Sequence, residues 1–417
     1  MLETLTKQEF LKRSKAYWNP DRTQFWQDAG VDLVMDRREG YLFWDMDGRR
    51  LIDLHLNGGT YNLGHRNPEI VAAIEDAMSR FDMGNHHFPA LTRTALAEAL
   101  VATCAPNMSR VVYGASGGEA IDIAIKTARH TRQRRKIISI VKGYHGHTGL
   151  AVAAGDDSFS KLFLADRPDE FIQVPFNDLE AMEGALRGND VAGVVMETIP
   201  ATYGFPLPLP GYLAAVKDLC ERYGALYIAD EVQTGLLRTG EMWGISKAGV
   251  EPDILVTGKA ITGGMYPISC TVVSEECSAW LEQDGFGHIS TSGGAEIGCM
   301  VGLKVLEICR RPEVRSMVHY IAERFGEGLR AIQDCFPSWL VGIRQDGLVM
   351  GLEFDHPEGA KLVMREFYAN GIWAIFSTLD PRVLQFKPGL LMSPDLVDEA
   401  LDRAEAAIAA AAAKAGR

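Results

Sequence analysis

Two side chains that could take part in catalysis, Asp230 and Lys259, each lie just past a short apolar run typical of a β-strand. They are 29 residues apart, with residues 225–229 before the aspartate and residues 254–257 before the lysine. In an open parallel sheet, ligands bind beyond the carboxyl ends of the strands, so we expect both side chains to face one crevice. There a lysine amine could form an imine with an aldehyde, and a buried carboxylate could keep a ring nitrogen protonated. Either residue alone would more often be a cap or a solvated loop residue.

The segment 111–129 reads as a strand, a turn of small residues and a helix. The turn contains Ser116, Gly117 and Gly118, so the backbone can approach a ligand closely. Free N–H groups at the start of the helix favour a phosphate, although the same segment could be only a tight strand-to-helix connection. The turn fits neither G-x-x-x-x-G-K-[ST] nor G-x-G-x-x-G, which argues against ATP or a dinucleotide as the ligand.

Three more residues could contact a flat ring. Tyr144 follows the apolar run 136–141 and could stack on a heterocycle, or could simply close the sheet. Val232, two residues after Asp230, could pack against the opposite face, and Gln233 could hydrogen-bond a ring hydroxyl. Taken with the aspartate, the lysine and the phosphate turn, these residues predict a pyridoxal phosphate site.

Composition restricts the class of protein further. With 417 residues, 47% of them hydrophobic and 23% charged, the chain can bury a large core and is expected to form two structural domains. The net charge of −13 argues against nucleic acid or an anionic membrane as the main partner. We expect no signal peptide and no membrane span, because neither apolar pattern is present. Seven scattered cysteines without a Cys-x-x-Cys motif predict reduced thiols in a cytoplasmic protein. No third ligand accompanies His145 and His147, so we expect no metal site.

The periodicity of apolar residues divides the chain into three parts. Residues 61–297 alternate helices with apolar strands, which predicts a mostly parallel sheet flanked by helices. Residues 298–417 predict a smaller α+β domain, and we expect the N-terminal segment 1–60 to pack with it because neither part alone carries much core. Strands are predicted at 31–35, 41–45, 50–56, 110–113, 136–141, 193–197, 225–229, 254–257, 349–354 and 383–386. Helices are predicted at 1–20, 68–81, 92–103 and 119–132, with a long helix from 298 and a final one before 417.

Five ordered blocks of the chain resemble the class III aminotransferases, which are pyridoxal phosphate enzymes of fold type I. The blocks are residues 116–120, 143–146, 230–235, 258–259 and 288–294. The resemblance runs from about residue 53 to residue 402 and is closest to the ornithine and ω-amino branches. It implies an α/β fold whose large domain holds a mostly parallel, seven-stranded sheet flanked by helices, with a smaller α+β domain built from both ends of the chain.

The resemblance also implies roles for individual residues. Lys259 would carry the cofactor as an imine, and Asp230 would pair with its ring nitrogen. Thr291 would reach the phosphate of the neighbouring subunit, which implies a homodimer with shared active sites. The other residues that the resemblance places around the cofactor are Ser116, Gly117 and Gly118 at the phosphate, Tyr144 and Val232 on the ring faces, and Gln233 at the ring hydroxyl.

Three positions depart from the pattern of the ornithine-type members. His147 and Gln385 stand where those members have arginines, and Thr202 stands where they have an acidic residue. Glutamine and neutral histidine lack the positive charge of arginine and its two parallel N–H donors. We therefore expect an amino donor that has no carboxylate at the distance from its amino group usual for ornithine-type substrates. Lys387 should share the strand face of Gln385, whereas Arg382 should point to the opposite face.

The predicted activity is transfer of an amino group from a primary amine to a keto acid or aldehyde by a ping-pong mechanism. By the resemblance, Gly58, Gly59 and Tyr61 belong to a segment that lines the substrate pocket, where they would give added room beside an aromatic wall, and we also place Phe88 in this pocket. The same residues would support an aminomutase, a racemase or a lyase. A nucleotide-binding or purely binding α/β protein without pyridoxal phosphate is a third alternative.

Overall fold

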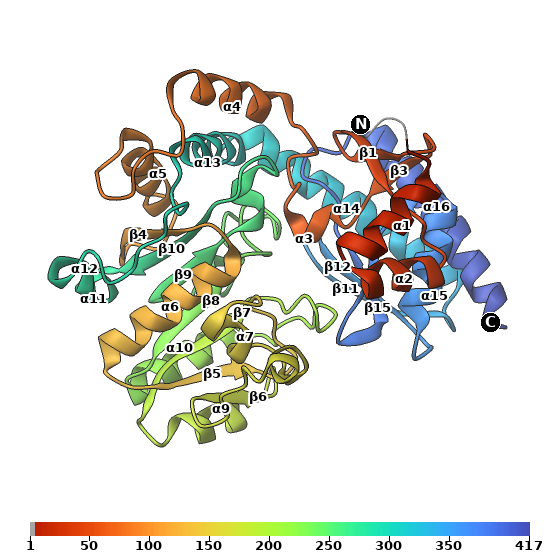
Figure 1. Ribbon diagram of the computed structural model, residues 1–417. Coiled ribbons are helices and arrows are strands. Elements are labelled where there is room, and N and C mark those ends of the chain that lie inside the picture. Colours follow the sequence, from red (N-terminus) through yellow and green to blue (C-terminus); the bar gives the residue numbers. More distant parts are fainter. Residues whose placement is uncertain (1–4) are drawn as a thin grey trace.

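The strands that precede Asp230 and Lys259 are neighbours in a sheet of seven strands (Figure 1). In the computed structural model, which describes residues 5–417, the spatial order is β4 (Met108–Gly114), β10 (Ser269–Ser274), β9 (Ile254–Thr257), β8 (Leu226–Asp230), β7 (Val191–Glu197), β5 (Lys136–Ile140) and β6 (Phe171–Val174). Neighbouring strands from β9 to β6 are parallel, and β10 is antiparallel to both of its neighbours. The predicted α/β fold with a mostly parallel, seven-stranded sheet is therefore confirmed.

The apolar pattern does not predict β6 or β10. Strand β10 carries serine, cysteine and threonine side chains, yet all of its residues are buried. Ser269 Oγ donates to the carbonyl of Ser116 at 2.7 Å, and Thr271 Oγ1 donates to the carbonyl of Ala120 at 2.8 Å. These carbonyls, at the start of helix α6 (Gly117–Arg132), satisfy the hydroxyls, so a polar sequence can occupy a buried strand.

Both faces of the sheet are covered, which explains the continuous apolar runs of its strands. In β8, Leu226 and Ile228 belong to the apolar cluster beneath α6. Tyr227 and Ala229 point the other way, into the cluster that includes helix α10 (Tyr212–Tyr223). The carboxyl end of β8, where Asp230 lies, is thus held from two sides.

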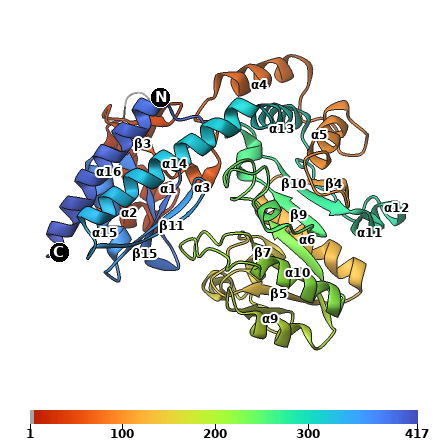
Figure 2. The same cartoon turned by 180° about the vertical axis from the view of Figure 1, so that it is seen from behind.

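A second lobe contains both ends of the described chain (Figures 1 and 2). One of its sheets has the order β1 (Met35–Glu39), β2 (Leu42–Asp45), β3 (Arg50–Asp53) and β13 (Ile372–Trp373), and β3 pairs with β13 in parallel. The other sheet has the order β11 (Leu340–Asp346), β12 (Val349–Phe354), β15 (Asp380–Phe386) and β14 (Ile375–Ser377). Helices α14 (Pro312–Cys335), α15 (Gly359–Ala369) and α16 (Pro394–Lys414) complete this lobe. The N-terminal hairpin therefore shares a sheet with the C-terminal segment.

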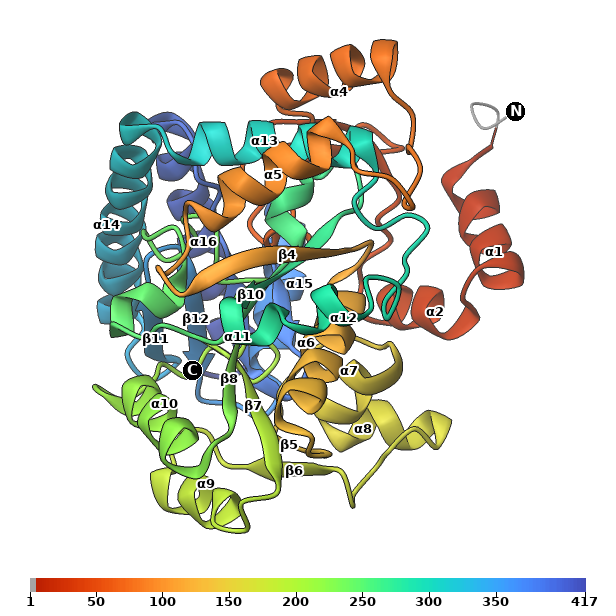
Figure 3. The same ribbon diagram turned by 90° about the vertical axis from the view of Figure 1, so that its left-hand side faces the viewer.

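Helix α13 (Glu296–Cys309) packs on α4 (Pro68–Arg80) and α5 (Leu91–Val101) rather than on the second lobe (Figure 3). The boundary predicted at 297/298 falls inside this helix. We propose that the C-terminal part of the small domain begins with α14, and that residues 1–60 form its N-terminal part.

Prolines begin two helices that were not predicted separately. The helix expected from residue 298 is α13 followed by α14, and α14 starts at Pro312. The helix expected at 1–20 is shorter, α1 (Lys7–Tyr17), and a further helix, α2 (Pro20–Asp28), starts at Pro20. Proline lacks an N–H and suits the first turn of a helix, so it ends the preceding helix and begins a new one. Residues 1–4 lie outside the described residues, and the strand expected at 31–35 is instead β1, from Met35 onward.

The remaining helices are short or flank the elements above: α2 (Pro20–Asp28), α3 (Leu56–Gly59), α7 (Gly149–Ala154), α8 (Asp157–Ser160), α9 (Leu179–Leu186), α11 (Glu275–Ser278), α12 (Trp280–Gln283), η1 (Lys161–Phe163), η2 (Gly244–Ala248) and η3 (Lys259–Thr262). None of the helices within residues 5–417 combines the length and apolar character that crossing a membrane requires.

Candidate active site

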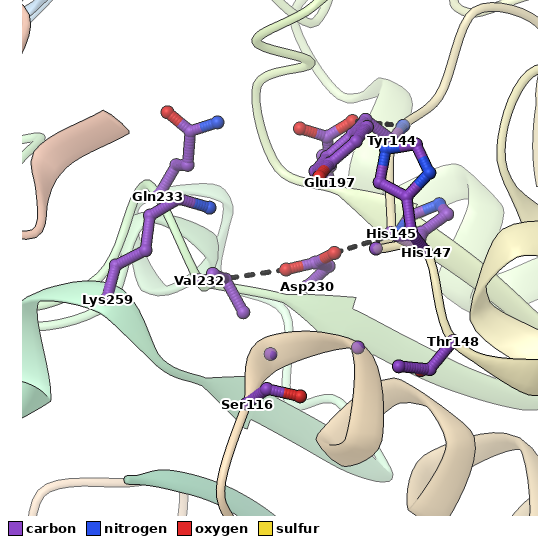
Figure 4. Close-up of a pocket in the computed structure, with 13 residues that line it drawn as sticks. Ser116, Tyr144, His145, His147, Thr148, Glu197, Asp230, Val232, Gln233 and Lys259 are labelled. Carbon is purple, nitrogen blue, oxygen red and sulfur yellow. Dashed lines mark hydrogen bonds and ion pairs between the residues drawn. The ribbon is translucent and has the colours of Figure 1, made fainter. Parts of the chain in front are cut away.

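A cavity of about 310 Å³ opens where the carboxyl ends of β7 and β8 meet the N-terminus of α6 (Figure 4). Its size suits a small-molecule ligand. Asp230 and Lys259 both line it, as their places after neighbouring strands predict. The full lining is Ser116, Gly117, Gly118, Tyr144, His145, Gly146, His147, Thr148, Glu197, Asp230, Val232, Gln233 and Lys259.

Asp230 is held at both carboxylate oxygens. Its Oδ2 lies 2.8 Å from His145 Nδ1, and its Oδ1 accepts the backbone N–H of Val232 at 3.1 Å. Asp230 and His145 are both buried. Burial lowers the pKa of His145, but the hydrogen bond and charge of Asp230, together with the charge of Glu197, outweigh it and leave the pKa raised. The two contacts thus fix the orientation of the carboxyl group at the edge of the cavity.

Lys259 begins η3 with a positive φ of 43°, a conformation that side chains other than glycine rarely adopt. The lysine side chain reaches into the cavity past Gly58, where an added Cβ would lie 2.9 Å from Lys259 Cε. Burial lowers the pKa of the Lys259 amine, while Asp230 and Glu197 oppose that shift. An amine with a lowered pKa is more often unprotonated and is a better nucleophile and base.

The start of α6 forms a cradle of closely packed backbone. Ser116 caps the helix and accepts the N–H of Glu119 at 3.2 Å. A Cβ on Gly118 would lie 2.7 Å from Thr148 Oγ1, and one on Gly146 would lie 2.6 Å from the Cα of Gly118. Backbone therefore requires glycine at position 146, and a Cβ at position 118 would have to displace Thr148. The uncovered N–H groups of the first helical turn face an opening suited to an anion.

Glu197, at the end of β7, also lines the cavity. Its Oε1 accepts the N–H of Tyr144 at 3.0 Å, and its Oε2 accepts the N–H of Ala201 at 3.1 Å. Burial raises the pKa of Glu197 to about 7; His145 opposes this shift and the nearby charge of Asp230 adds to it. The carboxyl group fixes the loop that carries Tyr144.

Tyr144 belongs to a group of three aromatic rings at one side of the cavity. Its ring centroid lies 5.4 Å from that of His147 and 5.6 Å from that of Phe159, both edge to face. Burial lowers the pKa of His147, and the positive charge of Arg22 lowers it further. His147 is thus a largely neutral ring at a position where an arginine would be cationic.

Gln385 and Lys387 lie together behind the cavity wall. Lys387 Nζ donates to Gln385 Oε1 at 2.6 Å and to Gln233 Oε1 at 3.1 Å. Gln385 Nε2 donates to the carbonyl of Ala201 at 3.2 Å, so its amide is engaged at both ends. Arg382 turns away and pairs with Glu353 at 3.0 Å, which confirms that Lys387, and not Arg382, shares the face of Gln385.

The other residues expected at the site do not line the cavity. Gly59 is buried near Arg238, with an added Cβ 3.8 Å from Nη2, and the Tyr61 ring lies 3.9 Å from that of His65. Thr202 donates to the carbonyl of Lys142 at 3.3 Å. Phe88 and Thr291 are exposed, outside the cavity of their own chain.

The sequence does not indicate the roles of several residues at the site. His145 stands out in the sequence only as half of a possible metal pair, but its Nδ1 is hydrogen-bonded to Asp230. Glu197 and Thr148 line the cavity, and Lys387 holds Gln233. The only local signal for Glu197 and His145 is their place at the end of β7 and in the loop after β5, and for Lys387 it is the strand face that it shares with Gln385.

The family profile described as aminotransferase class-III matches residues 26–408. The chain belongs to the class III aminotransferase family. A relative from Archaeoglobus fulgidus, described as an uncharacterized aminotransferase, is 44% identical over 392 residues, which cover 94% of this chain and 92% of the relative.

Solved structures agree with this assignment. The ornithine aminotransferase of Toxoplasma gondii ME49 matches with a TM-score of 0.89 and 25% identity, covering 100% of this chain and 97% of that one. The N-acetylornithine aminotransferase of Stenotrophomonas maltophilia K279a matches with a TM-score of 0.80 and 26% identity, covering 94% and 100%. The taurine:2-oxoglutarate aminotransferase of Bifidobacterium kashiwanohense, solved with pyridoxal phosphate and glutamate, has the same fold with a TM-score of 0.88 and 24% identity, covering 97% and 98%. The predicted fold type, enzyme class and cofactor are therefore confirmed: the protein is a pyridoxal-phosphate-dependent aminotransferase.

The cavity fits this cofactor chemically. The backbone cradle at Gly118 suits a phosphate, and the paired Asp230 suits a protonated ring nitrogen. Lys259 supplies an amine of lowered pKa in the same cavity. The donor set therefore matches an anionic, aromatic aldehyde.

Proposed function

We propose that this aminotransferase takes its amino group from a primary amine that lacks a carboxylate at the distance usual for ornithine-type substrates. The acceptor is a keto acid or an aldehyde. The observation that carries the proposal is the state of Gln385, whose amide bonds Lys387 and the carbonyl of Ala201 and has no free end for a substrate carboxylate. Suitable donors are alkyl or aryl amines, diamines, and amino groups on larger hydroxylated or apolar molecules.

The neighbouring substitutions support the same proposal. Thr202 stands where ornithine-type members have an acidic residue that could pair with an arginine. Its hydroxyl instead donates to the backbone carbonyl of Lys142. His147 is a largely neutral ring in contact with Tyr144 and Phe159. A carboxylate binds best to a bidentate cation, and neither position provides one.

The residues of the cavity have separate tasks in this mechanism. Pyridoxal phosphate supplies an aldehyde that takes up the amino group and a ring that accepts electrons from the reacting carbon. Tyr144 and Val232 would hold the ring from its two faces, and Asp230, oriented by His145, would keep a proton on the ring nitrogen. Lys259 would carry the cofactor through Nζ and, once displaced by the substrate amine, would move a proton at the same atom.

The start of α6 would anchor the cofactor. The N–H groups at Gly117 and Gly118 and the Ser116 hydroxyl would hold the phosphate, with the helix dipole favouring its negative charge. Gln233, three residues beyond the carboxylate that would hold the ring nitrogen, would donate to the ring hydroxyl.

We also propose a homodimer in which Thr291 completes the partner's phosphate site. Thr291 is exposed and does not line the cavity of its own chain. Exposed apolar side chains lie in the same loop and in a segment near it, including Phe286 at 64%, Ile289 at 52% and Phe88 at 66% exposure. Burying such a patch against a second copy would be favourable. A cytoplasmic location is proposed from the cysteine pattern of the sequence.

A half-reaction screen tests the proposed donor. The holoenzyme is mixed with alkyl amines, aryl amines and diamines, and with ornithine, acetylornithine and 4-aminobutyrate, and pyridoxamine phosphate formation is followed by absorbance. We expect faster reaction with the amines. Strong preference for the three amino acids would contradict the proposal.

Steady-state kinetics test the reaction type. Varying donor and acceptor together should give parallel double-reciprocal lines. Turnover of a single substrate without any acceptor would indicate an aminomutase, a racemase or a lyase instead.

A further inference from the structure

Lys387 carries an amine that is almost completely buried, with 2% of the residue exposed. Within the described part of the chain, no carboxylate lies within ion-pair distance of Lys387. Its Nζ contacts the amide oxygens of Gln233 and Gln385 and lies 5.4 Å from the centroid of the Phe205 ring. Burying an amine without a counter-charge is costly, so this arrangement must be supported by its hydrogen bonds.

The amine determines how both amides are turned. Its Nζ donates to Gln385 Oε1 and to Gln233 Oε1, so each amide has its oxygen turned toward the amine. For Gln385 this agrees with the opposite end of the amide, where Nε2 donates to the carbonyl of Ala201. In Gln233 only the amide oxygen is engaged, by Lys387, because the rest of the amide faces the cavity.

Figure 4 shows the consequence for Gln233. The amide nitrogen of Gln233 lies on the side of Tyr144 and Glu197, and the oxygen lies on the opposite side. An amide free to rotate could present either group to a ligand. With its oxygen engaged by Lys387, Gln233 presents N–H groups to the cavity.

We propose that Lys387 is a positioning residue that locks the Gln233 amide with its N–H groups toward the ring oxygen of the cofactor. This inference rests on the contact proposed above between Gln233 and the ring hydroxyl. A fixed donor at that oxygen favours its ionised form and weakens its hold on the proton that it shares with the lysine-bound group. Lys387 therefore adjusts the acid–base behaviour of the bound cofactor without touching it.

The test is a pH titration of the visible absorbance of the holoenzyme, together with the dissociation constant of the cofactor. In Lys387→Met the side chain keeps its length and loses its amine, so Gln233 can turn its oxygen inward. We expect the titration midpoint to rise by about 0.5–1 pH unit and the cofactor to bind about 3- to 10-fold more weakly. Lys387→Arg retains a donor and should recover most of both values. An unchanged midpoint and affinity in Lys387→Met would overturn the proposal.

A double-mutant cycle shows whether the effect passes through Gln233. Gln233→Ala should shift the midpoint, and adding Lys387→Met to it should cause no further shift. Additive shifts would overturn the proposal, because Lys387 would then act independently of the amide. If the midpoint shifts in Gln233→Ala but not in Lys387→Met, the inference about Lys387 alone is refuted. If the midpoint does not shift in Gln233→Ala, the proposed contact between Gln233 and the ring hydroxyl is refuted as well. The amine screen is independent of both results.

Two controls test whether the shift comes from a general change of charge or from damage to the fold. Lys142→Met removes a lysine that lies 4.8 Å from the Tyr203 ring and does not touch Gln233, and it should keep the wild-type midpoint. An equal shift in this variant would assign the effect to general loss of positive charge and overturn the proposal. The unfolding temperature of each apoenzyme shows whether loss of the buried amine affects the fold.

Discussion

His145 Nδ1 and Asp230 Oδ2 are 2.8 Å apart, although the two residues are separated by 85 positions in the sequence. Because the carboxylate accepts, the proton lies on Nδ1 of the imidazole. Asp230 also accepts the N–H of Val232, so neither of its oxygens is free to rotate away from the cavity. The acid that is proposed to hold the ring nitrogen is thus oriented by a histidine that does not itself need to touch the ring.

His145→Leu should reduce kcat/KM for the best amine about 10- to 100-fold, since a hydrogen bond to a charged group contributes about 1.5–3 kcal/mol. The carboxylate would keep only its bond from Val232 and would be less well aimed. Cofactor affinity, measured by dialysis and fluorescence, should fall in parallel. His145→Gln, which retains a donor, should lose less. Wild-type kcat/KM in the leucine variant would show that the bond does not orient Asp230 productively.

Gly118→Ala should weaken cofactor binding by at least about 10-fold, because the new Cβ would lie 2.7 Å from Thr148 Oγ1 and must displace the cradle. Thr148→Ala in the same chain removes the atom that clashes and should restore part of the affinity. Gly184→Ala in α9, where an added Cβ meets nothing within 4 Å, serves as the control for a glycine replacement as such. Cofactor affinity is measured by titrating each apoenzyme. Equal affinity for Gly118→Ala and wild type would contradict a tight cradle at this position.

The sequence predicts the framework of the large domain well, for a physical reason. Strands buried on both faces, such as β8 and β9, are continuous apolar runs, and their predicted bounds differ from the observed ones by at most one residue. Asp230 ends such a strand and Tyr144 lies shortly after another, β5, and the order of the parallel strands brings the two residues to one end of the sheet. Residues at strand ends could therefore be found from local patterns.

The supporting contacts could not be found in this way. Lys387 and Gln233 are 154 positions apart and belong to different lobes, so no local pattern indicates that they touch. The same holds for His145 and Asp230, which come from strands that are not direct neighbours in the sheet. Such contacts depend on how the lobes and loops pack, which periodicity does not encode.

Glu197 should make the stability of the apoenzyme depend on pH. Its pKa is about 7 in the folded protein against an ordinary 4.5, so the folded state binds the proton more tightly between these values. The free energy of unfolding therefore decreases as pH rises from 4.5 to 7, by up to roughly 3 kcal/mol from this group. Glu197→Gln lacks this dependence and has only a constant loss of one hydrogen bond.

The comparison is made with unfolding temperatures between pH 5 and pH 8 at fixed protein concentration. The wild type should lose Tm relative to Glu197→Gln as the pH rises through this range. Glu180→Gln, at an exposed position of α9, controls for loss of a carboxylate at the surface. A difference between wild type and Glu197→Gln that does not change with pH would contradict the raised pKa.

Gln385→Arg should destabilise the protein instead of creating a carboxylate site. The position is buried and Lys387 Nζ lies 2.6 Å from the present amide oxygen, so an arginine there would be a buried cation beside an amine and without a counter-charge. Such a buried, unpaired charge costs about 3–5 kcal/mol, and Tm should fall accordingly. Adding Thr202→Glu should recover part of the loss and should raise the ratio of kcat/KM for 4-aminobutyrate over an alkyl amine by about 10-fold. An unchanged ratio would show that another part of the cavity selects the donor.

Mixing two inactive variants tests whether the active sites are shared between subunits. Lys259→Ala removes the lysine that carries the cofactor, and Thr291→Ala removes a side chain that is exposed on its own chain. If Thr291 completes the partner's site, a mixed dimer has one site with both defects and one intact site. Unfolding and refolding the two variants together should therefore restore activity to about a quarter of the wild-type level, since random pairing makes half of the dimers mixed.

Each variant refolded alone is the control and should stay at its own low activity. Size-exclusion chromatography establishes that the mixture forms dimers of the wild-type size. A mixture no more active than the average of the two separate variants would place Thr291 outside the partner's site. Wild-type activity of Thr291→Ala refolded alone would lead to the same conclusion, because the threonine would then not be needed in either subunit.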